Sequence, residues 1–207
     1  MNLVTSPLPN LAVLASGSGS NFAAIAQAIQ AGHLHAQIQV LISNHPEAGV
    51  RRRAQHLQIP EVVINHRDFP TREDFDQKIL ETLQQLQVEW VILAGWMRRL
   101  TAVLVDAYPA RILNIHPSLL PSFPGMHAVE QALDFGVKIT GCTVHIVTLE
   151  VDAGPILKQA AVPVLEGDTP ESLAARIQAE EHRIYPEAIA QCLVQAANGM
   201  DLTELSP

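Results

Sequence analysis

The sequence predicts an α/β fold with a doubly wound, mostly parallel sheet, Rossmann-like in its N-terminal half and continuing into a mixed C-terminal half. Short, continuous apolar runs recur along the chain, as is typical of parallel strands covered on both faces. Segments with helical spacing of apolar residues separate these runs, which indicates right-handed βαβ units. The first run ends in a glycine-rich turn that leads into a helix, an arrangement common at the ligand-binding edge of such sheets.

Five apolar runs are expected to form the parallel strands. They are residues 11–15, 38–42, 62–64, 88–94 and 112–115. An alanine-rich segment, residues 22–29, follows the first run and has the composition of a helix.

The helix before the fourth strand has the clearest pattern. Four apolar residues are spaced by four, four and three, as on one helix face: Phe75, Ile79, Leu83 and Leu86. Thr71 supplies an N-cap for this helix, and Asp74 supplies an acid in its first turn.

The chain changes character after Pro117. Prolines recur up to Pro124, and residues 140–147 then alternate as a strand exposed on one side would. A final helix begins at Thr169, a cap that is followed by proline, and Pro186 is expected to bend or end it.

We expect one domain over residues 10–195, since no composition shift marks a linker. Residues 10–110 would form a nucleotide-binding half and residues 111–195 a second half. Residues 1–9 would be a loosely ordered leader and residues 196–207 a loosely held tail.

Charge and composition exclude several classes of partner. Thirteen basic and 21 acidic residues give a formal net charge of −8, so the surface as a whole repels nucleic acid and anionic membranes. The chain has neither a signal-peptide pattern nor an apolar stretch of about 20 residues that could cross a membrane. We therefore expect a cytoplasmic protein.

Cys142 and Cys192 are expected to be reduced core thiols, and no metal site is expected because His33 and His35 lack a third ligand at suitable spacing.

The glycine-rich turn is the first candidate site. Gly17 and Gly19 let the chain turn so that backbone N–H groups at the helix start can face an anion. Neither a third glycine nor an acid after the second strand is present, which disfavours a nicotinamide cofactor. A monophosphate site remains, or else a plain tight turn with Ser20 as the helix cap.

Asn114 and His116 are the second candidate site. They are two apart in a strand, so their side chains project from one face at its carboxyl end. An amide and an imidazole there suit chemistry at a carbonyl, because both can donate to an oxygen that gains charge. Asp152 lies in a later turn, where it is either a turn former or a carboxylate that acts on His116.

Three segments resemble the phosphoribosylglycinamide formyltransferases over residues 10–195. They are Ser-Gly-Ser-Gly-Ser-Asn at 16–21, Leu-Ala-Gly-Trp-Met-Arg at 93–98 and the run from Asn114 to Gly125. The resemblance implies transfer of a formyl group from 10-formyltetrahydrofolate to the amine of glycinamide ribonucleotide, in purine biosynthesis, by a monomer or homodimer without a metal. Asn114, His116 and Asp152 would form the catalytic set.

The resemblance also implies two groups of binding residues. The ribonucleotide would contact Gly19, Ser20, Asn21 and Glu181. The folate would contact Arg72, Met97, Arg98, Arg99, Leu100, Asn114, Thr148, Leu149, Glu150, Val151 and Asp152.

Glu181 also stands out without the resemblance. It lies four residues after Ile177 and three before Ile184 on the apolar stripe of its helix, where a carboxylate is costly unless something pairs with it. The neighbouring Glu180 could take the exposed position if the helix is rotated slightly. The chain departs from the family pattern at Ala153, where many members carry glycine, and at Met126, a common leucine position.

Several alternatives stay open. His127 and His145 either line the pocket or satisfy hydrogen bonds in the core. Residues 51–53, three arginines, form a solvated face or attract an acidic folate tail. A formyl-folate hydrolase and a non-catalytic folate or nucleotide sensor are the competing functions.

Overall fold

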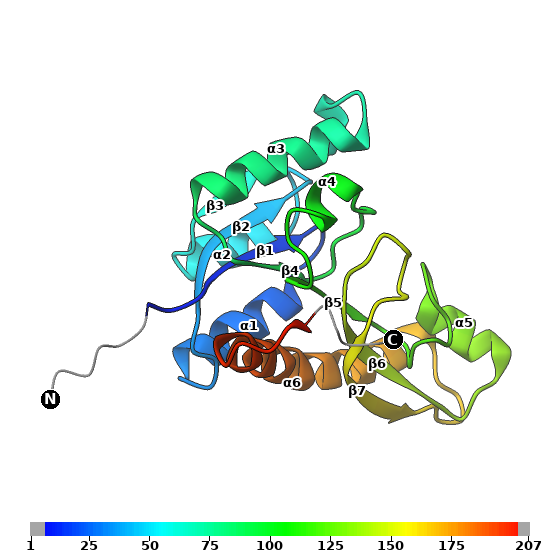
Figure 1. The fold of residues 1–207 in the computed structure, drawn as a ribbon. Coiled ribbons are helices and arrows are strands. Elements are labelled where there is room, and N and C mark those ends of the chain that lie inside the picture. The colour runs from blue at the N-terminus through cyan, green and yellow to red at the C-terminus, as the bar shows by residue number, and fades with distance from the viewer. Residues whose placement is uncertain (1–6, 203–207) are drawn as a thin grey trace, which may run out of the picture.

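The computed structural model describes residues 7–202 and contains one seven-stranded sheet flanked by helices (Figure 1). The strands are β1 (Asn10–Ala15), β2 (Gln37–Ser43), β3 (Glu61–Val63), β4 (Trp90–Leu93), β5 (Ile112–His116), β6 (Ile139–Ile146) and β7 (Ile156–Pro163). The helices are α1 (Ser20–Gln30), α2 (Val50–His56), α3 (Arg72–Gln85), α4 (Ala102–Val105), α5 (Ala128–Phe135) and α6 (Pro170–Ala197), with a 3₁₀ turn at His66–Asp68.

The strand order is β3-β2-β1-β4-β5-β6-β7. Strands β1 to β5 pair in parallel, whereas β6 pairs antiparallel with β5 and with β7. The predicted fold class, a mostly parallel sheet that continues into a mixed half, is therefore confirmed.

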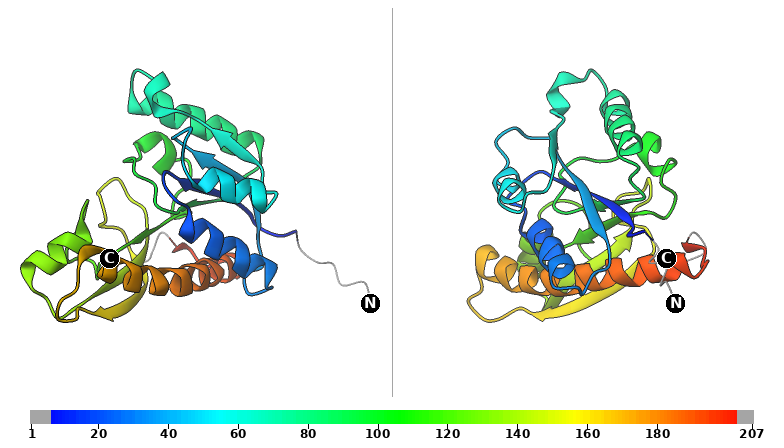
Figure 2. Two further views of the ribbon diagram at one scale, coloured as in Figure 1. Left: turned by 180° about the vertical axis from the view of Figure 1, so that it is seen from behind. Right: turned by 90° about the vertical axis from the view of Figure 1, so that its left-hand side faces the viewer.

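Helices cover both faces of the parallel strands (Figure 2). In β1, Leu11 and Val13 contribute to a core shared with α1, α2 and α6, while Ala12 and Leu14 contribute to a core shared with α3 and α4. This alternation follows from the two-residue period of a strand. It explains why the run is apolar throughout.

Strand β6 corrects one prediction. Residues 140–147 were expected to have a solvent-exposed face, but Thr140, Thr143 and His145 are 1%, 0% and 2% exposed. Helix α6 packs on this part of the sheet, and the proline-rich segment covers it as well. The Thr143 hydroxyl accepts from Leu120 N at 3.0 Å and donates to Ser118 O at 2.7 Å. Thr143 and His145 therefore serve buried hydrogen bonds, whereas the buried Thr140 hydroxyl has no partner among the described residues.

Of the two effects expected of Pro186, a bend or an end of the last helix, helix α6 excludes the second. It does not end at Pro186 but continues to Ala197, because its tertiary contacts outweigh the loss of one backbone hydrogen bond. The buried Tyr185 hydroxyl lies 3.0 Å from Leu93 O and 2.9 Å from Leu113 O, which holds the helix against β4 and β5. Within the expected tail, Leu202 is 5% exposed and packs in the core, while residues 197–201 are exposed. The remainder of the tail, residues 203–207, and residues 1–6 of the expected leader lie outside the described residues.

Within residues 7–202, no helix is long and apolar enough to cross a membrane.

Candidate active site

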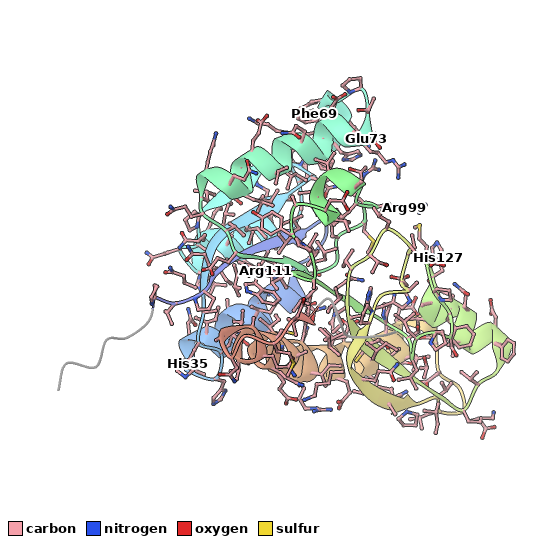
Figure 3. All side chains as sticks on the ribbon, viewed as in Figure 1. His35, Phe69, Glu73, Arg99, Arg111 and His127 are labelled. Atoms are coloured by element: carbon pink, nitrogen blue, oxygen red, sulfur yellow. The ribbon has the colours of Figure 1, made fainter. Side chains whose placement is uncertain are left out.

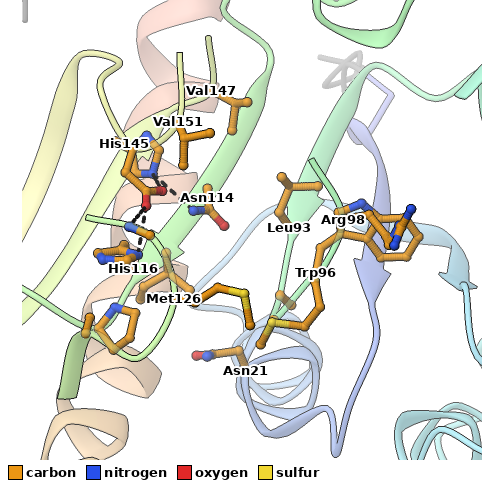
Figure 4. Close-up of a pocket in the computed structure, with 18 of the residues that line it drawn as sticks. Asn21, Leu93, Trp96, Arg98, Asn114, His116, Met126, His145, Val147 and Val151 are labelled. Atoms are coloured by element: carbon orange, nitrogen blue, oxygen red, sulfur yellow. Dashed lines mark hydrogen bonds and ion pairs between the residues drawn. The ribbon is translucent and has the colours of Figure 1, made fainter. Parts of the chain in front are cut away.

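A cavity of about 810 Å³ opens beyond the carboxyl ends of β1, β4 and β5 (Figure 4). Its walls come from residues 17–21, 93–100, 114–117, 125–130 and 147–152, with His145, Gln178 and Glu181. The glycine-rich turn, the end of β5 and the turn after β6 therefore face one shared space.

The structure brings Asn114, His116 and Asp152 together at one end of this cavity. Asn114 and His116 project from the same face of β5, and His116 is 5% exposed. The His116 Nδ1 atom lies 3.4 Å from Asp152 Oδ2, which also accepts a hydrogen bond from Gly125 N at 2.7 Å. The predicted proximity of these three side chains is thus present.

His116 has an oxygen acceptor at each ring nitrogen. Its Nε2 atom lies 2.9 Å from the Phe123 carbonyl oxygen, and its Nδ1 atom faces Asp152. A carbonyl and a carboxylate can only accept hydrogen bonds. Phe123 and Asp152 therefore hold the two edges of the His116 ring in place beside the cavity.

His145 is the site residue that the sequence left undecided. It is directly opposite Asn114 in the antiparallel pairing of β5 and β6. Its Nδ1 atom lies 3.0 Å from the acceptor Ile146 O and therefore carries the proton, so Nε2 accepts from Asn114 Nδ2 at 3.1 Å. Burial lowers the pKa of His145, which favours this neutral form. His145 therefore orients the Asn114 amide.

The glycine-rich turn leads into α1 at the opposite side of the cavity. Gly19 is the N-cap residue at φ +77°, and a side chain there would collide with Val50. The helix begins at Ser20, so the alternative in which Ser20 acts as the cap is wrong. Backbone N–H groups at the start of an 11-residue helix thus border the cavity, where they suit an anion.

Glu181 reaches the cavity from α6. It is 8% exposed, and its Oε2 atom accepts from Asn21 Nδ2 at 2.8 Å. Burial raises the pKa of Glu181. Glu180 instead pairs with Arg183, so the predicted orientation of the helix is confirmed.

The formyl transferase family matches residues 9–189 of this chain. The chain belongs to that family. It is 42% identical to the phosphoribosylglycinamide formyltransferase of Bacillus subtilis, over 90% of this chain and 95% of that protein. It is 46% identical to the trifunctional purine biosynthetic protein adenosine-3 of Drosophila pseudoobscura pseudoobscura over 91% of this chain.

The chain spans only 14 to 18% of the length of five such trifunctional relatives. Among solved structures, the glycinamide ribonucleotide transformylase 1 of Symbiobacterium toebii superposes with a TM-score of 0.89 at 49% identity. That alignment covers 92% of this chain and 90% of that one. The resemblance read from the sequence is therefore confirmed at the level of the family.

In this member of the formyl transferase family, the segments predicted to bind the folate line the other wall of the cavity. Residues 97–100 and 148–152 both contribute to it, and Arg99 Nη2 donates to Leu149 O at 3.2 Å. Met97 N donates to Ser16 Oγ at 2.9 Å, which connects this wall to the glycine-rich turn. Arg72 differs: it is exposed at the start of α3 and outside the cavity lining.

The other candidate site residues lie either at the opening of the cavity or on the surface outside it. His127 lines the mouth with a side chain that is 70% exposed, and both it and Arg99 are labelled in Figure 3. The arginines of α2 lie outside the cavity lining, where Arg51 pairs with Glu61 and Arg53 donates to Ser18 O. Gln178, one turn before Glu181, lines the cavity and was missed, because an exposed glutamine carries no signal in a single sequence.

The turn around Asp152 has an uncommon backbone. Asp152 itself adopts φ +53°, while Ala153 is not among the described residues with positive φ. The departure from glycine at position 153 is therefore compatible with this turn. Among residues 7–202, no three histidine, cysteine or acidic side chains form a group suited to a metal ion.

Proposed function

We propose that this protein transfers the formyl group of 10-formyltetrahydrofolate to the amine of glycinamide ribonucleotide, a step of purine biosynthesis. The observation that carries the proposal is the shared cavity, with an amide, an imidazole and a carboxylate at one end and a helix N-terminus at the other. The family membership and the identity to relatives of that name support it.

The ribonucleotide would occupy the side of the cavity near α1. Backbone N–H groups at Gly19, Ser20 and Asn21 suit its phosphate, because the helix start carries partial positive charge. Glu181 would accept hydrogen bonds from ribose hydroxyls. Hydroxyl donors favour its charged form and would offset the effect of burial, which raises its pKa.

The folate would lie between residues 97–100 and residues 148–152, with its formyl group near Asn114 and His116. The uncharged amine of the ribonucleotide attacks the formyl carbon, and the carbonyl oxygen gains negative charge. The second N–H of the Asn114 amide is the donor available to that oxygen. The His116 ring would donate to it through Nε2 once the substrate replaces the Phe123 carbonyl oxygen as the acceptor.

Collapse of the tetrahedral intermediate breaks the bond from the carbon to the folate nitrogen. That nitrogen takes up a proton, and the attacking amine loses one. His116 would transfer that proton between the two nitrogens, and Asp152 would keep the ring oriented. No covalent link to the protein forms. The proposed site uses no metal.

The test is to supply 10-formyltetrahydrofolate with and without glycinamide ribonucleotide and to follow the release of tetrahydrofolate. We expect release only with the ribonucleotide, together with one formylated ribonucleotide per turnover. Release that ignores the amine would indicate a hydrolase, and binding without release would indicate a sensor. The cytoplasmic location, the monomeric or homodimeric state and the contact between Arg72 and folate stay predictions.

A further inference from the structure

Asp76 is a buried carboxylate that the proposed chemistry does not use. It lies on α3, outside the cavity lining, and is 1% exposed. Its Oδ2 atom accepts two hydrogen bonds from one residue, from Thr101 N at 2.6 Å and from Thr101 Oγ1 at 2.9 Å. Burial raises the pKa of Asp76, and the bonds from Thr101 oppose that effect.

Thr101 ends the loop that forms the folate wall of the cavity. It directly follows residues 97–100 and is the N-cap residue of α4, yet its hydroxyl makes no cap bond to that helix. The hydroxyl donates to Asp76 instead. Asp76 therefore holds the C-terminal end of the loop.

The other end of the loop has its own anchors. Met97 N donates to Ser16 Oγ at 2.9 Å. The Trp96 ring stacks on Phe75, with ring centroids 6.0 Å apart and planes 6° from parallel. Phe75 directly precedes Asp76, so consecutive residues of α3 contact both ends of residues 97–100.

We propose that Asp76 is a positioning residue for the folate, which sets the shape of residues 97–100 through Thr101. The inference rests on the proposed function, because it assigns the folate to this wall. Hydrogen bonds to a buried carboxylate are stronger than those between neutral groups. Without the hydrogen bonds to Asp76, residues 97–100 sample more conformations. Binding of the folate must then order these residues, and the entropy lost in doing so lowers the affinity for the folate.

Two substitutions remove the contact to different extents. Asp76→Asn removes the charge and keeps an oxygen acceptor, while Thr101→Val removes only the hydroxyl donor at nearly constant shape. Thr101→Ser keeps that donor and serves as the rescue variant. Glu81→Gln is the matched control, because it neutralises an exposed acid farther along α3 that pairs with Lys78.

The measurements are steady-state kinetics with each substrate varied, and amide hydrogen exchange over residues 97–101. For Asp76→Asn we expect the KM for 10-formyltetrahydrofolate to rise about tenfold, with the KM for the ribonucleotide and kcat within about twofold of wild type. Thr101→Val should show a smaller rise. Exchange over residues 97–101 should be faster in both variants, while Thr101→Ser and Glu81→Gln should behave as wild type.

Three results would overturn the inference. An unchanged folate KM in both Asp76→Asn and Thr101→Val would do so while leaving the proposed function intact. Equal losses for both substrates would indicate a general structural role instead. A wild-type protein that fails to bind 10-formyltetrahydrofolate would overturn the proposed function and the inference together. If Asp76→Asn does not fold, the comparison of the folate KM between Thr101→Val and Thr101→Ser tests the inference without it.

Discussion

At the scale of single residues, two imidazoles lie near Asp152 and differ in what they can donate. His145 uses its one proton on Ile146 O and presents a lone pair to Asn114, whereas His116 faces an acceptor at each nitrogen. The shared placement of Asn114 and His116 could be predicted, because a two-residue spacing puts both on one face of a strand. The role of His145 could not, because it depends on the register between β5 and β6, which local sequence does not specify.

Replacing His116 tests its part in the chemistry. His116→Ala removes the imidazole proposed to carry protons beside the formyl group, so kcat should fall by at least about a hundredfold. His127→Ala is the control, because the His127 side chain is 70% exposed at the mouth, and it should stay within about twofold of wild type. Tetrahydrofolate release is the measurement. A near-normal rate in His116→Ala would remove His116 from the catalytic set.

Glu181 should impose a pH dependence on stability. Burial raises its pKa above that of the unfolded chain, so the unfolded state loses its proton first as the pH rises. The stability that Glu181 contributes is therefore present below its unfolded pKa and is lost as the pH rises through its folded pKa. A glutamine at this position does not ionise, so the protein does not lose this stability as the pH rises.

Glu181→Gln should accordingly stabilise the ligand-free protein at pH 8 by about 1 kcal/mol, the usual scale for a poorly compensated buried polar group. The gain should shrink toward pH 5, and the KM for the ribonucleotide should rise about tenfold. Glu180→Gln, which alters a glutamate paired with Arg183, is the control. Denaturant unfolding at both pH values measures the effect, and a gain independent of pH would contradict the argument.

At the scale of elements, local signals predict some segments well and others poorly. Helix α3 was predicted because its cap and apolar spacing lie within the segment, and Thr71 does accept from Asp74 N. Strand β7 was missed, because it lies at the edge of the sheet and Ala160 and Val162 are its buried side chains. Its place is set by pairing with β6, not by its own hydropathy.

The turn before α1 offers a test of an element boundary. Gly19→Ala introduces a side chain at φ +77° and against Val50, so stability should fall by about 1–2 kcal/mol from the left-handed backbone alone. The KM for the ribonucleotide should rise because the N–H groups that face the anion shift. Gly17→Ala is the matched control, since a side chain there meets no atom within 4 Å. Equal effects of the two substitutions on stability and KM would contradict this account of the turn.

At the scale of the whole molecule, the sheet joins the two halves that the sequence suggested. Strands β4 and β5 pair across the boundary near residue 110. One hydrophobic core contains Leu11 from the first strand as well as Ile177 and Leu202 from the C-terminal end. The cavity takes its walls from both halves, so neither half alone can form the proposed site. Sequence motifs could not predict that the two halves share one core, because this depends on α6 packing back onto α1.

Because the core and the sheet are shared, the chain should unfold in a single cooperative transition. A ligand that contacts mainly one half should then stabilise the whole molecule. Ribonucleotide at 100 times its Kd should add about 2.7 kcal/mol to the free energy of unfolding and raise the Tm by about 5–10 °C. Calorimetry measures both, with circular dichroism and Trp fluorescence as independent probes of the midpoint. Two separate transitions, of which the ribonucleotide shifts only one, would show that the halves unfold independently despite their common sheet.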